Sequence, residues 1–370
     1  MDLSKMVRNN LAGIKPYVPG KPIEEVEREL GIKDVIKMAA NENPLGPSPK
    51  SVSAIQDLAA KAQIYPDGNC YYLKDALCEH WEVSPNQLMV GNGSDELLKL
   101  IAETFLLPGD EVVMGQPSFS EYTFAAKLMD AECIYVPLKD FTHDLSAMAE
   151  KITDKTKLLF VCNPNNPTGT VVTKQEIDDL MEKVPDNVMV IFDEAYYEYV
   201  QNQDYPETLD YVKQGRENVI ILRTFSKVYG LAGLRIGYGI AHPEVISWIK
   251  RTMEPFNVNN FAQAAALAGI KDQDHVEESV QLNEAGKKQI YRGLEERGLS
   301  YVPTEANFIY IRVGVSSKEL FPAMLQRGVI VRSGDIFGNE DYIRLTIGTE
   351  EQNKRFFDAL DDSLAELKNK

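Results

Sequence analysis

Seven short apolar runs lie between Gln87 and Ile240 and limit what this chain can fold into. Segments of helical character separate them, and the runs read QLMVG, EVVMG, CIYVP, KLLFVC, VMVIFD, VIILR and RIGYGI. Most runs are apolar at successive positions, which is typical of strands covered on both faces. Strands that alternate with helices predict a mainly parallel α/β sheet. Ligands of such sheets bind at the carboxyl ends of the strands.

The pattern changes after about Gly269. Charged helical segments there surround the shorter strand-like runs ANFIYIRV, GVIVR and YIRLTIG, which predicts a smaller α+β domain. We therefore expect a large α/β domain over residues 41–268 and a C-terminal small domain over residues 269–370. Residues 1–40, which are rich in Pro and Glu, are expected to form an N-terminal arm and part of the small domain. We find no internal repeat and no flexible linker.

Composition excludes several classes of partner. The 370 residues include 39 Lys and Arg against 56 Asp and Glu, a net charge of −17 that repels nucleic acids and anionic membranes. Neither is expected as a partner. The four cysteines form no CxxC pair, and such sparse thiols suit a reducing compartment. No stretch resembles a secretory signal or a membrane span, so we expect a soluble cytoplasmic protein without a metal site.

The segment VIILRTFSKVYGLAGLRIGYG, residues 219–239, carries the strongest chemical signal. The strand-like part ends, the hydroxyls of Thr224 and Ser226 follow, and Lys227 stands in the turn. A second cation, Arg235, lies eight residues further on among glycines, which allow close approach of a ligand. Hydroxyls and a guanidinium suit a phosphate dianion, and a lysine at a strand end suits a Schiff base to pyridoxal phosphate (PLP). An ordinary surface lysine is the alternative.

Three further segments offer what the rest of this cofactor needs. VMVIFDEAYY places Asp193 at a strand end, where a carboxylate can hold a pyridine nitrogen protonated. Tyr196, three residues later, and Asn166, in the turn of FVCNPNNPTGT, are both able to donate to the ring's phenolic oxygen. In MVGNGSDELLKLI a glycine turn opens a helix, so the backbone amides there are expected to bind a phosphate. These are the amides of Gly93, Ser94 and Asp95.

Each of these segments has a simpler explanation when taken alone. FDEAY is compatible with a nucleotide-hydrolysing strand, although no GxxxxGK[ST] phosphate loop occurs in the chain. Ser94 is also a suitable helix cap, and NPNNPTG is also a tight loop. The four segments follow one another as phosphate turn, Asn turn, Asp strand and Lys turn. This joint occurrence favours a cofactor site over the separate explanations.

The chain resembles the fold type I PLP-dependent aminotransferases and, within them, the histidinol-phosphate branch. The motifs that carry this resemblance run over nearly the whole chain: KPYVPGKPIEEVERELG, MAANENPLGPSP, GNGSDE, NPNNPTG, DEAYYEY, TFSKVYGLAGLRIGY, ANFIYIRV, GVIVR and YIRLTIGT. The central motifs mark the superfamily, and the KPY and ANENPLGPSP stretches favour the histidinol-phosphate branch. The resemblance implies a large PLP-binding domain, a small domain and a homodimer with shared active sites.

The resemblance also implies roles for individual residues around the cofactor. Lys227 would bind the cofactor covalently and shuttle a proton, Asp193 would pair with the ring nitrogen, and two donors would hold the phenolic oxygen. These donors are Tyr196 and Asn166. Phe119 falls where the family stacks an aromatic ring on the cofactor, with plain core packing as the alternative. The phosphate would be held by the amides of Ser94 and Asp95, by Thr224, Ser226 and Arg235, and by Tyr65 of the partner subunit.

Substrate recognition follows from the same resemblance. Arg344 matches the family arginine that binds the α-carboxylate of amino and keto acids in a bidentate manner. In histidinol phosphate a phosphate takes the place of the carboxylate. We expect Arg332 as the second cation for this dianion, with a structural salt bridge as the alternative. Tyr17, from its own or the partner subunit, and Asn43 are expected to line the same pocket, and simple packing is the alternative for Tyr17.

The resemblance implies a ping-pong transfer of an amino group between L-histidinol phosphate and 2-oxoglutarate, which yields glutamate. Three alternatives stay open: an aromatic amino-acid aminotransferase, including one of dual specificity, a phospho-amino-acid decarboxylase, and a non-catalytic binding protein on the same scaffold. The last would be expected to lose Lys227 or Asp193, and both are present. Because the substrates, the cofactor and the chain are all anionic, capture must rest on a local cluster of cations. We assign Lys227, Arg235, Arg332 and Arg344 to this cluster.

Overall fold

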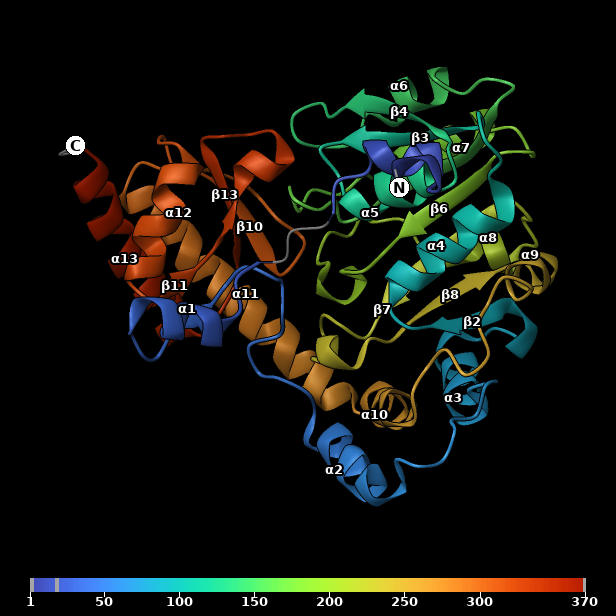
Figure 1. Ribbon diagram of the computed structural model, residues 1–370, viewed down its shortest axis with the longest axis horizontal. Coiled ribbons are helices and arrows are strands. Elements are labelled where there is room, and N and C mark those ends of the chain that lie inside the picture. The colour runs from blue at the N-terminus through green and yellow to red at the C-terminus, as the bar shows by residue number, and fades with distance from the viewer. Residues whose placement is uncertain (1–2, 17–19, 369–370) are drawn as a thin grey trace.

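A seven-stranded sheet forms the centre of the larger part of the molecule (Figure 1). The computed structural model describes residues 3–16 and 20–368. In spatial order the strands are β2 (Leu88–Gly91), β8 (Gly237–Ala241), β7 (Val219–Thr224), β6 (Met189–Asp193), β5 (Thr156–Cys162), β3 (Glu111–Gln116) and β4 (Glu132–Pro137). β8 runs antiparallel to both of its neighbours, and the other pairs are parallel. The predicted mainly parallel α/β sheet is confirmed, and each predicted run overlaps one of these strands.

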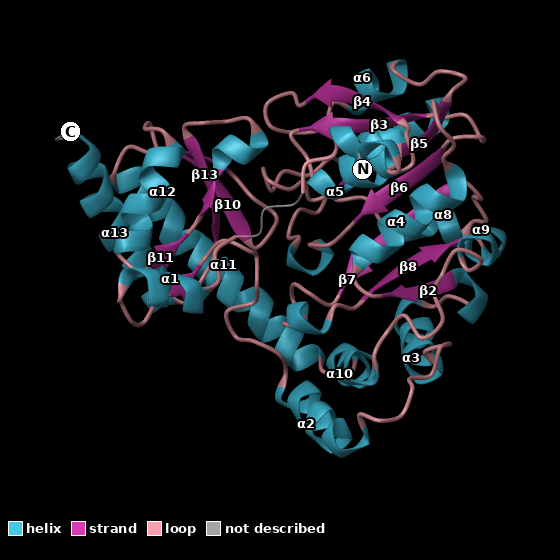
Figure 2. Ribbon diagram, in the orientation of Figure 1, coloured by secondary structure: helices cyan, strands magenta, loops and turns pink. Residues whose placement is uncertain are grey.

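Helices cover both faces of this sheet (Figure 2). The helices on one face are α4 (Ser94–Phe105), α5 (Ser120–Leu128) and α9 (Pro243–Ile249). Those on the other are α3 (Tyr71–Trp81), α6 (Leu145–Glu150), α7 (Lys174–Lys183), α8 (Leu209–Lys213) and α10 (Asn260–Ile270), with α2 (Pro49–Leu58) packed on α10. Ile191 and Leu222 pack in the apolar cluster on the face covered by α4, α5 and α9. Their neighbours Phe192 and Ile221 pack in the cluster on the opposite face. All four are fully buried, which explains why these strands are apolar at successive positions.

The same alternation places polar residues on opposite faces where β6 and β7 end. Asp193 faces the cavity described below, whereas Glu194 and Arg223 lie on the α3 side of the sheet. Nη2 of Arg223 is 2.8 Å from Oε2 of Glu194, and both side chains are 1% exposed. The guanidinium carbon lies 3.9 Å from the ring centre of Trp81 and 3.6 Å from that of Tyr197. A buried ion pair held between two aromatic rings therefore joins the two strand ends behind Asp193.

The smaller part of the molecule contains an antiparallel four-stranded sheet. Its strands in spatial order are β12 (Arg332–Ser333), β13 (Tyr342–Thr346), β10 (Phe308–Arg312) and β9 (Ser300–Val302). A separate parallel pair joins β1 (Ile36–Lys37) to β11 (Val329–Ile330). The helices of this part are α1 (Ile23–Leu30), α12 (Ser317–Gln326) and α13 (Glu350–Lys368). The short strands expected after Gly269 are therefore present.

Two segments connect the parts. α11 (Gln273–Glu296) packs its first half on the cluster beside the large sheet and its second half in the core of the smaller part (Figure 1). Near the N-terminus, Asn10 donates to the carbonyl oxygen of Lys127 at the end of α5, at 2.8 Å. Further on, Val26 of α1 packs with Leu325 of the smaller part. The first forty residues thus contact both parts, and the domain limits at 41–268 and 269–370 stay a prediction.

Short 3-10 helices complete the fold. They are η1 (Leu3–Lys5), η2 (Asn9–Gly13), η3 (Ala59–Lys61), η4 (Pro85–Gln87), η5 (Tyr197–Tyr199), η6 (Ala232–Leu234) and η7 (Gly334–Phe337). Within residues 3–16 and 20–368, no helix combines the length and the apolar character needed to span a bilayer.

Replacing Arg223 by methionine tests how much the buried ion pair contributes to the free energy of unfolding. The change leaves the Glu194 carboxylate buried without its cation, and breaking such a pair costs about 3–5 kcal/mol. We expect the midpoint of urea unfolding to fall accordingly. Arg312→Ala is the matched control, because its pair with Asp341 has side chains 58% and 39% exposed, and such pairs contribute about 0–1 kcal/mol. Equal unfolding midpoints for the two variants would contradict this account.

Candidate active site

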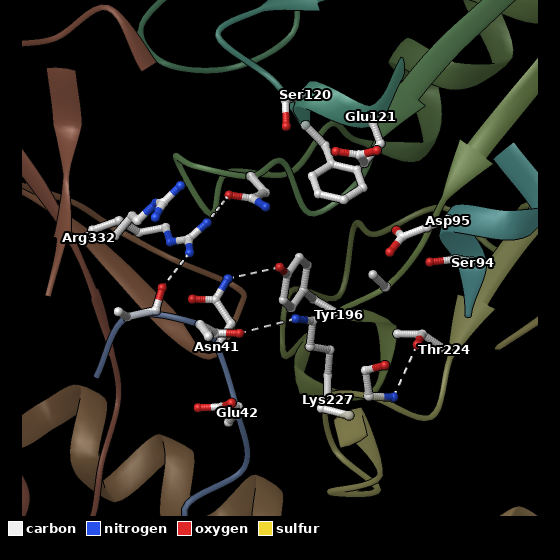
Figure 3. Close-up of a pocket in the computed structure, with 18 of the residues that line it drawn as sticks. Asn41, Glu42, Ser94, Asp95, Ser120, Glu121, Tyr196, Thr224, Lys227 and Arg332 are labelled. Carbon is white, nitrogen blue, oxygen red and sulfur yellow. Dashed lines mark hydrogen bonds between the residues drawn. The ribbon is translucent and has the colours of Figure 1, made fainter. Parts of the chain in front are cut away.

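A cavity of about 630 Å³ opens beside the carboxyl ends of β5, β6 and β7, between the two parts of the molecule (Figure 3). Residues of the large part and arginines of the smaller part meet in its wall. The cavity brings together twelve of the residues singled out from the sequence: Ser94, Asp95, Phe119, Asn166, Asp193, Tyr196, Thr224, Ser226, Lys227, Arg235, Arg332 and Arg344. Segments far apart in the chain therefore converge on one site.

Lys227 lies in the turn after β7 and points into the cavity (Figure 3). Its Nζ atom donates to the carbonyl oxygen of Ala40 at 3.4 Å and lies 5.6 Å from the ring centre of Tyr196. Burial, and after it the positive charge of Arg344, lowers the pKa of Lys227 to about 8. An appreciable fraction of this amine is therefore unprotonated near neutral pH, as a nucleophile or a base requires.

Asp193 ends β6 and is 2% exposed. Its Oδ2 atom accepts a hydrogen bond from the hydroxyl of Tyr122 at 2.6 Å. Oδ1 is buried and has no hydrogen-bond partner among the residues that the structure describes. Burial raises the pKa of Asp193 to about 6, and the hydrogen bond from Tyr122 opposes this rise. At neutral pH the site thus presents a carboxylate with one acceptor oxygen left for a ligand that carries an N–H or O–H group.

The start of α4 lies at one end of the cavity, and its groups suit an anion. Gly93 precedes the helix with a φ of 83°, and a Cβ atom there would lie 2.7 Å from Nη2 of Arg235. Arg235 in turn donates to Oδ2 of Asp95 at 2.9 Å. The first N–H groups of a helix have no partner within it, and they carry the positive end of the helix dipole. The hydroxyls nearby belong to Ser94, Thr224 and Ser226.

Tyr196 and Asn166 are held by hydrogen bonds that leave donors toward the cavity. The hydroxyl of Tyr196 accepts from Nδ2 of Asn41 at 2.9 Å, so its own proton stays available. Burial raises the pKa of Tyr196 far above its ordinary value, which keeps it a phenol. Oδ1 of Asn166 accepts from Nη1 of Arg344 at 2.5 Å, so its amide N–H groups remain for a ligand.

Two arginines form the opposite wall. Arg344 of β13 is 7% exposed and donates from Nη2 to the carbonyl oxygen of Ala39 at 2.8 Å. Arg332 of β12 is directly opposite Arg344 in the antiparallel ladder, and such residues project to the same face. In the described part of the chain no carboxylate lies within salt-bridge distance of Arg332. The structural salt bridge considered for Arg332 is therefore not found there.

Tyr65 and Gly93 do not line the cavity. Gly93 lies directly behind Arg235 and allows that side chain to approach. Tyr65 is 79% exposed, and its ring stacks on Phe256 with ring centres 4.9 Å apart. Tyr17 lies outside the described residues.

Asn43 also lies elsewhere than expected. Its amide donates to the carbonyl oxygen of Val228 at 2.7 Å and to Oγ of Ser279 at 2.8 Å, and it is 8% exposed. The chain adopts a left-handed conformation at Asn41, with φ of 56°, and the next turn closes as Oδ1 of Asn43 accepts from the amide of Leu45. Asn41, rather than Asn43, therefore lines the pocket, and Asn43 anchors the turn behind it.

Comparison with known proteins assigns the family. A family model described as aminotransferase class I and II matches residues 33–360. The chain belongs to the class I and II aminotransferases. Histidinol-phosphate aminotransferase of Moorella thermoacetica is 56% identical over 358 residues, which cover 97% of this chain and 93% of that protein. Histidinol-phosphate aminotransferase 2 of Carboxydothermus hydrogenoformans is 48% identical, with 96% and 98% covered.

A solved structure agrees with the family assignment. It is the histidinol-phosphate aminotransferase from Sinorhizobium meliloti in complex with pyridoxal-5'-phosphate, and it matches with a TM-score of 0.88 at 26% identity. The match covers 95% of this chain and 96% of that one.

Two residues that contact the predicted site residues of this aminotransferase were not predicted from the sequence. Tyr122, which donates to Asp193, lies in the first turn of α5, three residues after Phe119, which precedes the helix, and their ring centres are 5.6 Å apart. That spacing was available in the sequence as a signal. Asn41, which donates to Tyr196, sits in a loop where the direction of a side chain depends on the tertiary fold. No spacing rule could have found it.

The pKa of Lys227 in this aminotransferase can be measured on the cofactor-free protein. We expect acylation of Nζ by an amine-directed reagent, followed by mass spectrometry of the Lys227 peptide, to rise with pH around a midpoint near 8. Arg344→Gln removes a positive neighbour that disfavours the ammonium form, so the midpoint should move to higher pH. Arg332→Gln is the matched control. It also removes a cation from the cavity, but Arg332 is not among the charges that shift the pKa of Lys227, so the midpoint should stay near 8. An unchanged midpoint in Arg344→Gln would contradict the electrostatic assignment.

Proposed function

We propose that this aminotransferase uses PLP to move an amino group between L-histidinol phosphate and 2-oxoglutarate, a step of histidine biosynthesis. One structural observation carries the proposal: Lys227 and Asp193 face a pair of converging arginines, Arg332 and Arg344, across one cavity. The relatives named above, 56% and 48% identical over nearly the whole chain, support histidinol phosphate as the substrate.

The residues present fit the cofactor. The unpartnered Oδ1 atom of Asp193 supplies the acceptor that a protonated pyridine nitrogen needs. The N–H groups at the start of α4, with Arg235 and the nearby hydroxyls, suit a phosphate dianion. Tyr196 and Asn166 each keep a donor for the phenolic oxygen. Phe119 lines the cavity as a flat apolar ring and is placed to pack against the cofactor.

The chain's own groups then perform the proton chemistry. PLP, when bound through Lys227, supplies an electron sink that makes the proton on the substrate's Cα atom removable. Once the substrate amine has replaced Lys227 on the cofactor, the freed Nζ would accept that proton, and a pKa near 8 suits a base at neutral pH. The carboxylate of Asp193 is ionised above a pKa of about 6 and would hold the ring nitrogen of the cofactor in its cationic form. Tyr196 and Asn166 would hold the ring through hydrogen bonds to its phenolic oxygen.

The arginine pair accounts for two substrates in one pocket. Arg344 offers a planar guanidinium to the α-carboxylate of glutamate. In histidinol phosphate the phosphorus lies two bonds further from Cα than a carboxyl carbon does, and it carries a second negative charge. Arg332, next to Arg344 in the ladder and free of carboxylate partners in the described residues, supplies the additional cation. The same wall therefore accepts a carboxylate in one half-reaction and a phosphate in the other.

The other functions considered from the sequence have less support. An aromatic aminotransferase needs no second cation beside Arg344, yet Arg332 lines the cavity. A decarboxylase would use the same cofactor residues, but the similar relatives named above are aminotransferases. A non-catalytic scaffold has no need for a lysine of lowered pKa beside a buried carboxylate, and both are present.

We also propose a homodimer that works in the cytoplasm, with the substrates as its small-molecule partners. Tyr65 is highly exposed on this chain, and the neighbouring Ile64, Tyr71 and Tyr72 are 57%, 64% and 73% exposed. Such a group of exposed apolar side chains is typical of a protein–protein contact. We expect Tyr65 to reach the cofactor phosphate of a second copy, and we expect Tyr17 near the substrate.

The substrate proposal is tested by steady-state kinetics with 2-oxoglutarate as acceptor. We expect kcat/KM for L-histidinol phosphate to exceed that for phenylalanine and for tyrosine by at least tenfold, because only the phosphate uses both arginines. Arg332→Gln should reduce kcat/KM for histidinol phosphate far more than that for phenylalanine, since a carboxylate still has Arg344. A preference for phenylalanine without activity on histidinol phosphate would overturn the proposal.

Hybrid dimers test the shared site. Lys227→Ala alone is expected to abolish transfer, and Tyr65→Phe alone to weaken cofactor binding. Mixed dimers with one subunit of each kind should regain one intact site, which unites Lys227 with the wild-type Tyr65 of the partner subunit. We expect its cofactor affinity to match that of the wild type in a titration followed by absorbance. Hybrids no better than Tyr65→Phe would show that Tyr65 serves its own subunit.

A further inference from the structure

The wall of the cavity carries four carboxylates, although the cofactor and both substrates are anionic. Three of these carboxylates have a partner in the structure. They are Asp95 with Arg235 at 2.9 Å, Glu42 with Lys37 at 2.7 Å, and Asp193 with the hydroxyl of Tyr122 at 2.6 Å. The fourth is Glu121, and in the part of the chain that the structure describes no cation lies within salt-bridge distance of it.

Glu121 is the second residue of α5 and follows Phe119 by two positions. Figure 3 draws it on the upper wall, away from Lys227 at the bottom and Arg332 on the left. It is half-buried, and this burial, with the nearby Asp95 carboxylate, raises the pKa of Glu121. The helix dipole favours a carboxylate at this position but supplies no hydrogen-bond donor to it.

A partly desolvated carboxylate is costly unless a donor satisfies it. Among the described residues the only hydroxyl that acts on Glu121 belongs to its neighbour Ser120. Glu121 lines both the cavity and the hollow beside it, so on the cavity side its free acceptor sites are open to solvent or to an N–H or O–H group of a bound ligand. Neither the phosphate nor the carboxylates of the substrates supply such a group. The only part of either substrate that does, besides the reacting amine, is the imidazole ring of histidinol phosphate.

We propose that Glu121 recognises the imidazole ring of histidinol phosphate by accepting a hydrogen bond from its N–H group. The proposal rests on the function proposed above. With the phosphate at the arginine wall and Cα beside Lys227, the ring is the part of the substrate left to reach the wall that holds Glu121. A neutral imidazole donates one N–H and an imidazolium ion donates two, so both forms satisfy the carboxylate.

This placement makes Glu121 a specificity-determining residue. A phenyl ring fits the same space but offers no N–H group, so Glu121 would lose solvent without gaining a partner. Glutamate brings a γ-carboxylate, which Glu121 repels toward the cationic side of the cavity. Loss of the charge at Glu121 should therefore act on the two half-reactions in different directions.

The test is Glu121→Gln, with each half-reaction followed separately by the absorbance of the holoenzyme in single-turnover experiments. A hydrogen bond to a charged group is worth roughly a tenfold change in affinity or more. We expect kcat/KM for histidinol phosphate to fall about tenfold, mainly through KM. For glutamate, KM should stay the same or fall, and kcat/KM for phenylalaninol phosphate should stay the same or rise. Glu121→Ala, which leaves no acceptor, should show the larger loss for histidinol phosphate.

Glu254→Gln is the matched control. Glu254 lines a hollow next to the cavity together with Glu121, but it does not line the cavity itself. Its substitution removes the same charge nearby and should leave all three substrates within about twofold of wild type. Cofactor absorbance and the unfolding midpoint verify that each variant is folded and loaded.

The outcomes separate this inference from the proposed function. An equal loss for histidinol phosphate and glutamate in Glu121→Gln would overturn the assignment, because recognition of imidazole cannot affect glutamate. Unchanged kinetics for histidinol phosphate would overturn it as well. A wild-type enzyme that is inactive on histidinol phosphate but active on aromatic amino acids would instead refute the proposed function itself.

Discussion

The buried ion pair between Arg223 and Glu194 is the constraint on which the active site depends. It joins the ends of β6 and β7, and these two ends present Asp193 and Lys227 to the cavity. Side chains alternate along a strand, so a register shift of one residue would turn Asp193 away and put Glu194 in its place. In the native register the Arg223 guanidinium lies between Trp81 and Tyr197 while it contacts Glu194. A buried pair adds little net stability, but here it penalises the wrong register.

Electrostatics at this site is local rather than global. The net charge of −17 opposes the approach of anions, while Arg235, Arg332 and Arg344 concentrate positive potential inside one cavity. Charges in the cavity also influence the pKa of Lys227. Arg344 lowers the pKa of Lys227, whereas Asp95 and Glu42 raise it, and burial prevails to leave it near 8. The acidic residues on the wall therefore limit how far the lysine's basicity falls.

Much of the fold and of the cofactor site could be predicted from the sequence, for a physical reason. Strands buried on both faces need continuous apolar runs, and a polar residue directly after such a run lies at the carboxyl edge of the sheet. Asp193 is the last residue of one run, Asn166 and Lys227 stand in the turns that follow two others, and all three line the cavity. The two arginines were assigned from a family resemblance instead, and the antiparallel pairing of β12 with β13 explains why they converge.

What could not be predicted depends on irregular backbone or on a second chain. Asn41 and Asn43 differ by two positions in one loop, and a left-handed turn at Asn41 decides which of them faces the cavity. Alternation rules do not extend through such a turn. Tyr65 is exposed on its own chain, and its proposed role in a second copy comes from the family resemblance, because a single chain offers no contact that tests it. The ion pair between Arg223 and Glu194 could be predicted only with the knowledge that β6 and β7 are neighbouring strands.

In a ping-pong enzyme the same side chains of the cavity wall meet two substrates in turn. The charged residues of the wall therefore differ in how much they affect the choice between these substrates. In the proposed reaction Arg344 meets an anion in both half-reactions, so it would contribute to affinity without discriminating between the substrates. Lys37 and Glu42 neutralise each other at 2.7 Å and make no net demand on either substrate. Arg332 and Glu121 are charges that the described chain leaves unmatched, and they lie on separate walls of the cavity (Figure 3). We therefore expect discrimination between the two substrates to depend on Arg332 and Glu121, whose charges a ligand can balance.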